Sequence, residues 1–343
     1  MVMIPGPALE VGIRTEFMDA YNTAISDQAL ITRAVREIGG LGRRVQRFAI
    51  PEAFSRPYRW DTDSDIAEDA VRYFASQFVV HNWGIKVEYR EDDKDDDQTG
   101  TLLATARKAG AGFPYLKERG LLQFVRAGTD PTLFPAVPNA ADGVPLFSAT
   151  DVDGANRFGI VGGNIEPGQG PTPDAIRETY MLALARFHNM RNTRGDRNND
   201  PANLKRFLIL YGTHLQPAVW RAFYQERPGV AVALGGASAI SGGAIGAAAA
   251  SNIIQNIDLV PQMVASPYLS DTNDMAVLAI DVPKSIASCT RRDVRELAAT
   301  MANSDYARKT RRESIQFDFR WGLGIPGIPF DWVQIDNTTS GVF

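Results

Sequence analysis

The sequence Trp83-Gly84-Ile85-Lys86-Val87-Glu88-Tyr89-Arg90 alternates between two kinds of residue, with the large apolar side chains at every odd position. Because side chains along a strand point to opposite faces in turn, this period of two predicts a half-buried strand. Upstream, the segment Arg43–Trp60 is rich in arginine, aromatic residues and proline, and proline opposes a helix there. We therefore expect residues 78–90 to close a long hairpin with residues 43–60, which together form an extended arm.

The charged and aromatic side chains of this arm fit two interpretations. Arginines interleaved with aromatic rings can bind single-stranded nucleic acid through charge and stacking, and the same residue types are enriched in protein interfaces. The acid run Glu91–Asp97 offers complementary charge to a neighbouring copy, so we favour the protein interface. The candidate intersubunit contacts are Arg43, Arg47, Phe54, Arg59, Trp60, Trp83, Lys86, Glu88 and Arg90.

Composition narrows the class of protein. The 343 residues suffice for two domains or one large one. A net charge of -4 gives no global sign of nucleic-acid binding. The single cysteine, Cys289, excludes an internal disulfide and fits a reducing compartment. No apolar run reaches the roughly 20 residues that a membrane helix needs, and the first residues do not form a signal peptide. We expect a protein that folds in a cytoplasm and has no membrane partner.

The rest of the chain mixes helices and strands. Thr99 is expected to cap a helix over 99–127, which Pro114 kinks or ends. Residues 128–170 predict an irregular excursion, longer than is usual inside one compact domain. Thr172-Pro173 then opens the clearest helix, and its apolar stripe consists of Ile176, Tyr180, Ala183, Leu184, Phe187 and Met190.

The other expected elements are shorter. Helical spacing in the N-terminal part follows a tail over residues 1–12, and a short helix is predicted over 66–75. Further helices are predicted over Pro217–Tyr224 and Arg291–Met301, and strands over Phe207–Tyr211, Ile257–Ala265, Met275–Ile280 and Ile315–Arg320.

The search for catalytic chemistry gives no catalytic residue, no cofactor site and no metal site. His81, His188 and His214 are scattered, without the spacing of a zinc site. The stretch 230–246 contains glycines after a strand-like segment, but it has neither the dinucleotide fingerprint nor a phosphate loop. A nucleotide-binding α/β enzyme that uses this stretch is kept as an alternative, and it predicts a parallel sheet.

Several segments together resemble the major head proteins of tailed bacteriophages with the HK97 fold, and above all the Mu-type major head subunit family. They are Trp83–Asp93 followed by the helix at 99–127, Pro145-Leu-Phe-Ser-Ala-Thr150, and Ser266–Leu269 with Met275–Ile280 leading to Phe317-Asp-Phe-Arg-Trp-Gly322. A histidine often follows the Leu-Phe-Ser segment in that family, whereas Asp151 follows here, so this match is partial. The resemblance spans residues 40–335.

The resemblance implies an α+β, HK97-like capsid fold with four parts. These are an N-terminal arm at 1–42, an E-loop hairpin at 43–98, a P domain with a long spine helix at 99–204 and 301–343, and an A domain at 205–300. The implied function is structural and not enzymatic. As a major capsid protein of the virion, assembled in the host cytoplasm, the chain would form an icosahedral head.

The implied partners follow from that function. They are the protein itself as pentamers and hexamers, a portal, scaffolding or cement proteins, and packaged double-stranded DNA bound nonspecifically through its phosphates. An encapsulin-like nonviral shell protein with the same fold is the second alternative.

Overall fold

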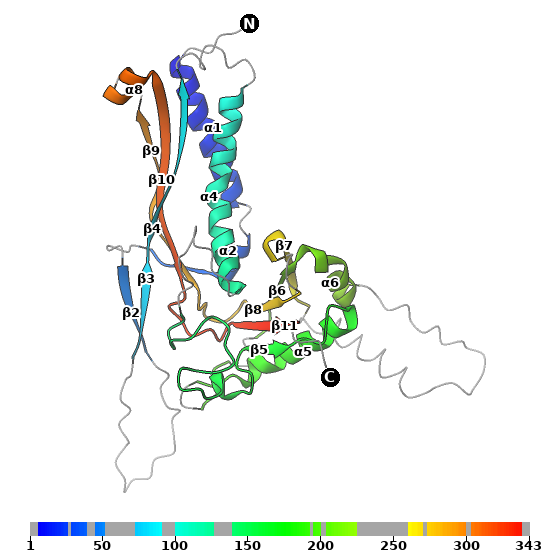
Figure 1. Cartoon of the computed structure of the whole chain (residues 1–343). Coiled ribbons are helices and arrows are strands. Elements are labelled where there is room, and N and C mark those ends of the chain that lie inside the picture. Colours follow the sequence, from blue (N-terminus) through cyan, green and yellow to red (C-terminus); the bar gives the residue numbers. More distant parts are fainter. Residues whose placement is uncertain are drawn as a thin grey trace, which may run out of the picture.

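The structure, a computed structural model, describes residues 6–26, 29–39, 45–51, 73–90, 100–126, 139–192, 195–199, 204–224, 260–269, 273–299 and 303–337. It consists of an elongated lobe, in which two long helices lie along a sheet, and a second lobe built on another sheet (Figure 1). Among these residues, no helix combines the length and the apolar character needed to cross a membrane.

The sheet of the elongated lobe has the order β1-β9-β10-β4. Its strands are β1 (Arg36–Glu37), β9 (Ala287–Ala299), β10 (Arg312–Gly324) and β4 (His81–Arg90). The quoted strand is therefore confirmed, and Val87 and Tyr89 are buried as its period predicts. Val87 lies opposite Ile315 and Ile85 opposite Phe317 in antiparallel register. The apolar sides of two long strands thus form one surface, which can be buried only beneath another layer.

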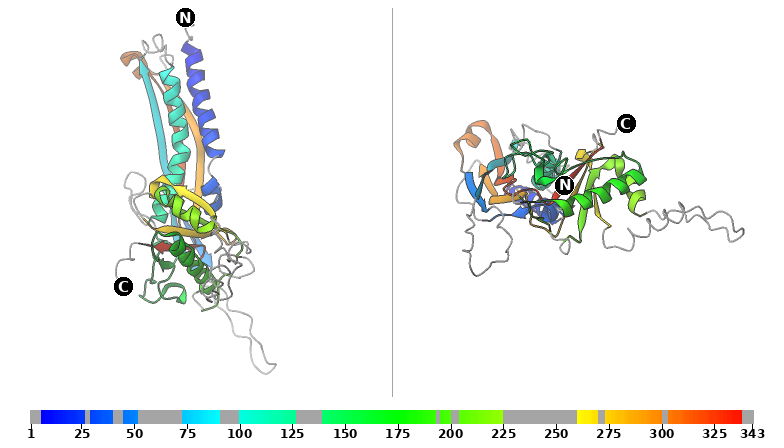
Figure 2. Two further views of the ribbon diagram at one scale, coloured as in Figure 1. Left: turned by 90° about the vertical axis from the view of Figure 1, so that its right-hand side faces the viewer. Right: turned by 90° about the horizontal axis from the view of Figure 1, so that it is seen from below.

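Two parallel helices form that layer. In α1 (Gly6–Ser26), Glu16 binds Arg107 of α4 (Thr101–Val125) at 2.7 Å. Further along both helices, Phe17 packs edge-to-face against Phe113, and it also stacks on Phe317 of the sheet at 3.6 Å between centroids. Both helices therefore run in the same direction along one face of the sheet (Figures 1 and 2).

The helix predicted over 99–127 is confirmed, but two details of it were wrong. α4 continues through Pro114 as one helix, because it buries residues on both sides of the proline, among them Ala106 and Leu121. That packing outweighs the roughly 3 kcal/mol that an interior proline costs. The residue before the helix is Gly100, with φ 66°, and it replaces the expected Thr99 as the cap position without any side-chain cap.

The second lobe is a five-stranded mixed sheet of order β5-β11-β8-β6-β7. Its strands are β5 (Ile165–Pro167), β11 (Trp332–Asp336), β8 (Met275–Ala279), β6 (Phe207–Gly212) and β7 (Gln262–Ser266). β6 is buried throughout. Phe207 and Ile209 belong to one apolar cluster, whereas Leu208 and Leu210 belong to the other, which includes the helices of the elongated lobe. The central strands are therefore covered on both faces, as their uninterrupted apolar sequences require.

Helices α5 (Pro173–Asn189) and α6 (Gln216–Phe223) cover one of those faces. The predicted α5 is confirmed in detail. Thr172 caps it by accepting a hydrogen bond from the amide of Ala175, Pro173 is in the first turn, and every residue of the predicted apolar stripe is buried. Here local signals and tertiary burial agree, which is why the sequence predicted the element well.

The predicted hairpin forms with a different return strand. β2 (Val45–Pro51) pairs with β3 (Tyr73–Val79), so that Val45 lies opposite Val79 and Pro51 opposite Tyr73. Of the predicted return strand 78–90, residues 78 and 79 do pair with β2, but the rest of the prediction was wrong, because β4 pairs along its whole length with β10. The chain leaves the hairpin at Val80, which is buried, and enters the core sheet directly.

Three local predictions were also wrong. The segment Arg291–Met301 does not form a helix, because residues up to Ala299 belong to β9 and pair with β10. Residues 73–75 are in β3 and not in a helix over 66–75. Residues from Gly6 onward belong to α1, although residues 1–12 were expected to form a tail.

The predicted domain ranges stay a prediction. Residues 205–300 contribute β6, β7 and β8 to the five-stranded sheet and β9 to the four-stranded sheet, whereas β11, near the C-terminus, completes the five-stranded sheet. Two short connections run directly between strands of the two sheets, 280–286 and 325–331, and they are bonded to each other through Gly327 N and Ser285 O at 3.1 Å.

Candidate intersubunit surface

The nine predicted contact residues fall into two groups. Arg43, Phe54, Arg59 and Trp60 lie outside the described residues, as does the 230–246 stretch, and of Arg47 only the backbone, opposite Gln77, is described. The remaining four, Trp83, Lys86, Glu88 and Arg90, belong to β4. Because side chains alternate along the strand, Trp83 points to one face of the sheet and the other three point to the opposite face.

Trp83 faces the helices. It is half-buried, its indole Nε1–H donates to the carbonyl oxygen of Trp321 at 3.1 Å, and it packs against the apolar core of the elongated lobe. This contact ties β4 to β10. A role for Trp83 between subunits stays a prediction.

Lys86, Glu88 and Arg90 lie on the opposite side of the sheet, which we call the open face. It consists of the even-numbered residues of β4 and β10 together with Arg292 and Arg295 of β9. Lys86 pairs with Glu88 at 3.2 Å, and Arg312 pairs with the same carboxylate at 3.4 Å. The hydrogen bond from Lys86, and then that from Arg312, lower the pKa of Glu88.

A second ion cluster lies further along the open face. Asp318 of β10 accepts hydrogen bonds from Arg292 at 3.0 Å and from Arg295 at 3.1 Å. The sequence did not predict that these two arginines belong to this surface, because Arg291–Met301 has the composition of a helix. The alternation in Ile315–Arg320 already placed Asp318 on the polar side, and this was the one signal that could have identified the cluster.

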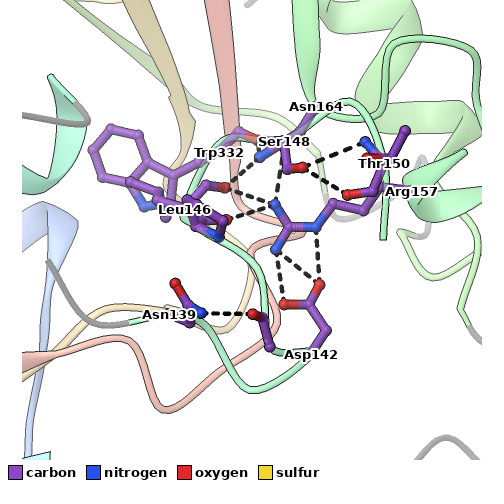
Figure 3. Close-up of polar contacts among 10 residues, drawn as sticks. Asn139, Asp142, Leu146, Ser148, Thr150, Arg157, Asn164 and Trp332 are labelled. Carbon is purple, nitrogen blue, oxygen red and sulfur yellow. Dashed lines mark hydrogen bonds and ion pairs between the residues drawn. The ribbon is translucent and has the colours of Figure 1, made fainter. Parts of the chain in front are cut away.

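The irregular segment that follows α4 is held by a buried arginine (Figure 3). Arg157, only 2% exposed, donates from Nε and Nη2 to Asp142 at 2.8 and 3.0 Å. Its Nη1 donates to the carbonyl oxygens of Pro145 and Leu146. The hydrogen bonds of the guanidinium group are thus made within the chain. They hold the segment in place and leave few donors for a ligand.

Asn164 connects this arginine to the five-stranded sheet. Its side-chain amide donates to the carbonyl oxygens of Leu146 at 2.8 Å and Trp332 at 3.3 Å, while its Oδ1 accepts from the amide of Ser148 (Figure 3). Burial raises the pKa of Asp142, and Arg157 opposes that shift. The predicted irregular segment is therefore an ordered structure between 139 and 170, anchored by polar contacts in place of regular pairing.

The described residues hold no group of three or more His, Cys, Asp or Glu side chains that could bind a metal. A cavity of about 250 Å³ lies between the end of α4 and the five-stranded sheet, lined by Val125, Leu269, Asp274 and Gln334 among others. Arg126 also lines it, and its other two polar side chains bond to each other, Gln334 to Asp274 at 3.4 Å. Both larger sheets are mixed, and not the parallel sheet that the nucleotide-binding alternative requires.

Comparison with known proteins gives a match in structure but not in sequence. No family model matches the chain, and no curated protein is significantly similar to it. The capsid of cyanophage P-SCSP1u matches with a TM-score of 0.55 at 10% identity, over 89% of this chain and 86% of that one. The mature capsid of bacteriophage PhiM1 gives 0.54 at 10% identity, over 91% and 88%.

A third match is the virus-like particle from Pyrococcus furiosus, with a TM-score of 0.51 at 10% identity, over 94% of this chain and 98% of that one. At such low identity these matches show the fold alone. The likeness extends over 89% or more of this chain and 86% or more of each matched chain. The chain therefore has the α+β fold of the HK97-type capsid proteins, as the sequence predicted.

Proposed function

We propose that this chain is a major capsid protein, which self-assembles into an icosahedral head shell around phage DNA. The observation that carries the proposal is the whole-length structural match to subunits of two phage capsids and a virus-like particle. The role is structural, and we assign no catalytic residue and no cofactor to it.

The geometry suits a subunit that is buried on several sides by its neighbours. The elongated lobe has one face of its sheet covered by α1 and α4, and the opposite open face carries two ion clusters together with Tyr306, which is 54% exposed. Arginine and tyrosine are typical of protein interfaces. Weak contacts of this kind add up when each subunit in a closed symmetric shell makes them repeatedly.

The finer assignments belong to the same proposal. Residues 43–98 would act as the E-loop lying over an adjacent subunit, and copies would form pentamers and hexamers. A portal, scaffolding or cement proteins, and packaged DNA held through its phosphates would complete the virion, assembled in the host cytoplasm. The sequence segments quoted above support membership of the Mu-type group.

Sedimentation velocity of the purified full-length chain tests the proposal. We expect particles that sediment far faster than any small oligomer, and whose yield rises with protein concentration, because association follows mass action. Particles that dissociate on dilution would still support it. A chain that sediments as a monomer at every concentration would contradict it.

A nonviral, encapsulin-like shell is the second candidate, and the match to the Pyrococcus furiosus particle favours keeping it. Particles purified from the native source separate the two. Nuclease-protected double-stranded DNA inside them supports the virion, and a protein cargo without DNA supports the nonviral shell.

A further inference from the structure

The open face carries more positive than negative charge. Glu88 is shared by two cations, Lys86 and Arg312, and Asp318 is likewise shared by Arg292 and Arg295. Each cluster therefore keeps one positive charge in excess. The whole chain, by contrast, has a net charge of -4, so this surface differs in sign from the molecule as a whole.

Arginine donors on this face are also left unused. Arg320, an even-numbered residue of β10, lies between Asn82 of β4 and Arg292 of β9. The Nε atoms of Arg292 and Arg320 are buried, with no hydrogen-bond partner among the described residues. Both side chains are nevertheless partly exposed, so an approaching carboxylate meets their positive charge, although the enclosed Nε atoms stay out of its reach.

Apolar groups accompany these charges and favour a protein partner over duplex DNA. Leu297 of β9, opposite Gln316, is 44% exposed. Tyr306, in the short helix α8 (Asp305–Thr310) at the tip of the sheet, is 54% exposed and lies under the ammonium group of Lys86 at 5.6 Å. Phosphate-binding surfaces need no such apolar residues, whereas protein interfaces combine arginine with aromatic contacts.

We propose that the open face binds the acid run Glu91–Asp97 of a second copy of this chain. The run is Glu-Asp-Asp-Lys-Asp-Asp-Asp, so it carries six carboxylates and one ammonium group. Its charge complements the face, and it follows Arg90 at the end of the same sheet. The proposal rests on the proposed self-assembly, for which it names one contact.

The length of the chain limits how far the acid run can reach along its own sheet. Arg90 lies opposite Arg312, and Asp318 is six residues further along β10, about 20 Å away. Residues 91–99 must return to Gly100, where α4 starts on the helix side. Asp95, at the middle of this connection, is five residues from either end and reaches at most about 18 Å. The backbone of the run therefore ends short of Asp318 in its own sheet, whereas the run of another copy has no such limit.

A peptide titration tests the contact without requiring shells. The receptor is the full-length chain with Asp95→Asn, Asp96→Asn and Asp97→Asn, which removes three of the six carboxylates of the acid run and so weakens the competition from other copies. The probe is a fluorescent peptide with the sequence of residues 91–100, followed by anisotropy. We expect saturable binding, weakened roughly tenfold when Arg292→Gln and Arg295→Gln are added, since each exposed ion pair contributes up to about fivefold.

The matched control is Arg221→Gln in the same receptor, because Arg221 is an exposed arginine on α6, outside the open face. It should change the affinity less than twofold. No binding of the peptide, or equal binding to the Arg292→Gln/Arg295→Gln receptor, would overturn the proposal. A 20-base-pair DNA duplex that binds the face more tightly than the peptide would overturn it in favour of nucleic acid.

This readout separates the two proposals. If the wild-type chain stays monomeric but the peptide binds as expected, self-assembly fails while the open face is confirmed as a carboxylate-binding surface. If shells form and the peptide does not bind, the assembly proposal stands and this contact is wrong.

Discussion

Gly110 of α4 lies directly on the backbone of Phe17 in α1, so that a Cβ atom at position 110 would overlap the carbonyl oxygen of Phe17. The two helices of the elongated lobe therefore cross at a point where only glycine fits. Close contact at this point also places Phe17 between Phe113 of α4 and Phe317 of the sheet.

We predict that Gly110→Ala destabilises the chain by about 2 kcal/mol, because a backbone carbonyl cannot move aside as a flexible side chain can. Gly112→Ala is the matched control in the same helix, since nothing lies within 4 Å of a Cβ there. It should stabilise the chain by up to about 1 kcal/mol through helix propensity alone. Denaturant unfolding of both variants measures the difference, and equal stability for the two would contradict the close crossing.

The buried pair of Arg157 and Asp142 gives a second prediction. Asp142→Ala should cost about 3 kcal/mol or more, because it leaves the buried guanidinium group without its counter-charge. Asp153→Ala, on the exposed part of the same irregular segment, should change the stability by less than about 0.5 kcal/mol. If denaturant titrations gave Asp142→Ala the same small effect as its control, the network of Figure 3 would not hold the segment.

Asp331 predicts how stability depends on pH. The carboxylate is fully buried where the two connections between the sheets meet, and it accepts a hydrogen bond from the amide of Ser285 at 3.0 Å. Burial raises the pKa of Asp331 to about 6, partly opposed by Ser285 and Lys284. Between about pH 4 and 6 the folded chain keeps this proton while the unfolded chain has lost it. The free energy of unfolding should therefore fall as the pH rises through this window, and no further above it.

Asp331→Asn should remove that fall, which amounts to about 3 kcal/mol for a shift of this size. The measurement is the difference in unfolding free energy between variant and wild type at a series of pH values, in which the other titrating groups cancel. Parallel curves for the two proteins from pH 4 to 7 would show that Asp331 does not carry the dependence.

The β2–β3 hairpin allows a test of the predicted E-loop. Pro51 and Tyr73 lie opposite each other, so residues 52–72 can be replaced by a short glycine-containing turn without stretching the chain. We expect the variant to unfold within about 0.5 kcal/mol of wild type, yet to form no shells, as judged by light scattering. Normal assembly of the shortened chain would show that this segment is not an intersubunit arm.

The sequence predicted best those elements whose local signals agree with their burial. In α5, the cap at Thr172, the proline after it and the apolar stripe all indicate the same helix. In β4, the period of two identified the strand but not its partner. Pairing with β10 brings together residues more than 200 positions apart, and no local pattern encodes such a contact.

Two errors have the same physical origin. The residues of β9 have a helical composition, but pairing with β10 on one side and β1 on the other outweighs that propensity. Pro114 opposes a helix locally, but packing on both sides of it keeps α4 continuous. Because β9 was expected to be a helix, the sequence did not place Arg292 and Arg295 on the open face. The alternation of β4 did place Lys86, Glu88 and Arg90 on one face, and their role between subunits stays a prediction.

Electron microscopy of the purified full-length chain tests the central claim most directly. Negatively stained samples, prepared over a range of protein concentration and salt, should contain closed shells of uniform size. A chain that remains monomeric in every condition, including with a scaffolding protein supplied, would contradict the proposal that it builds a capsid.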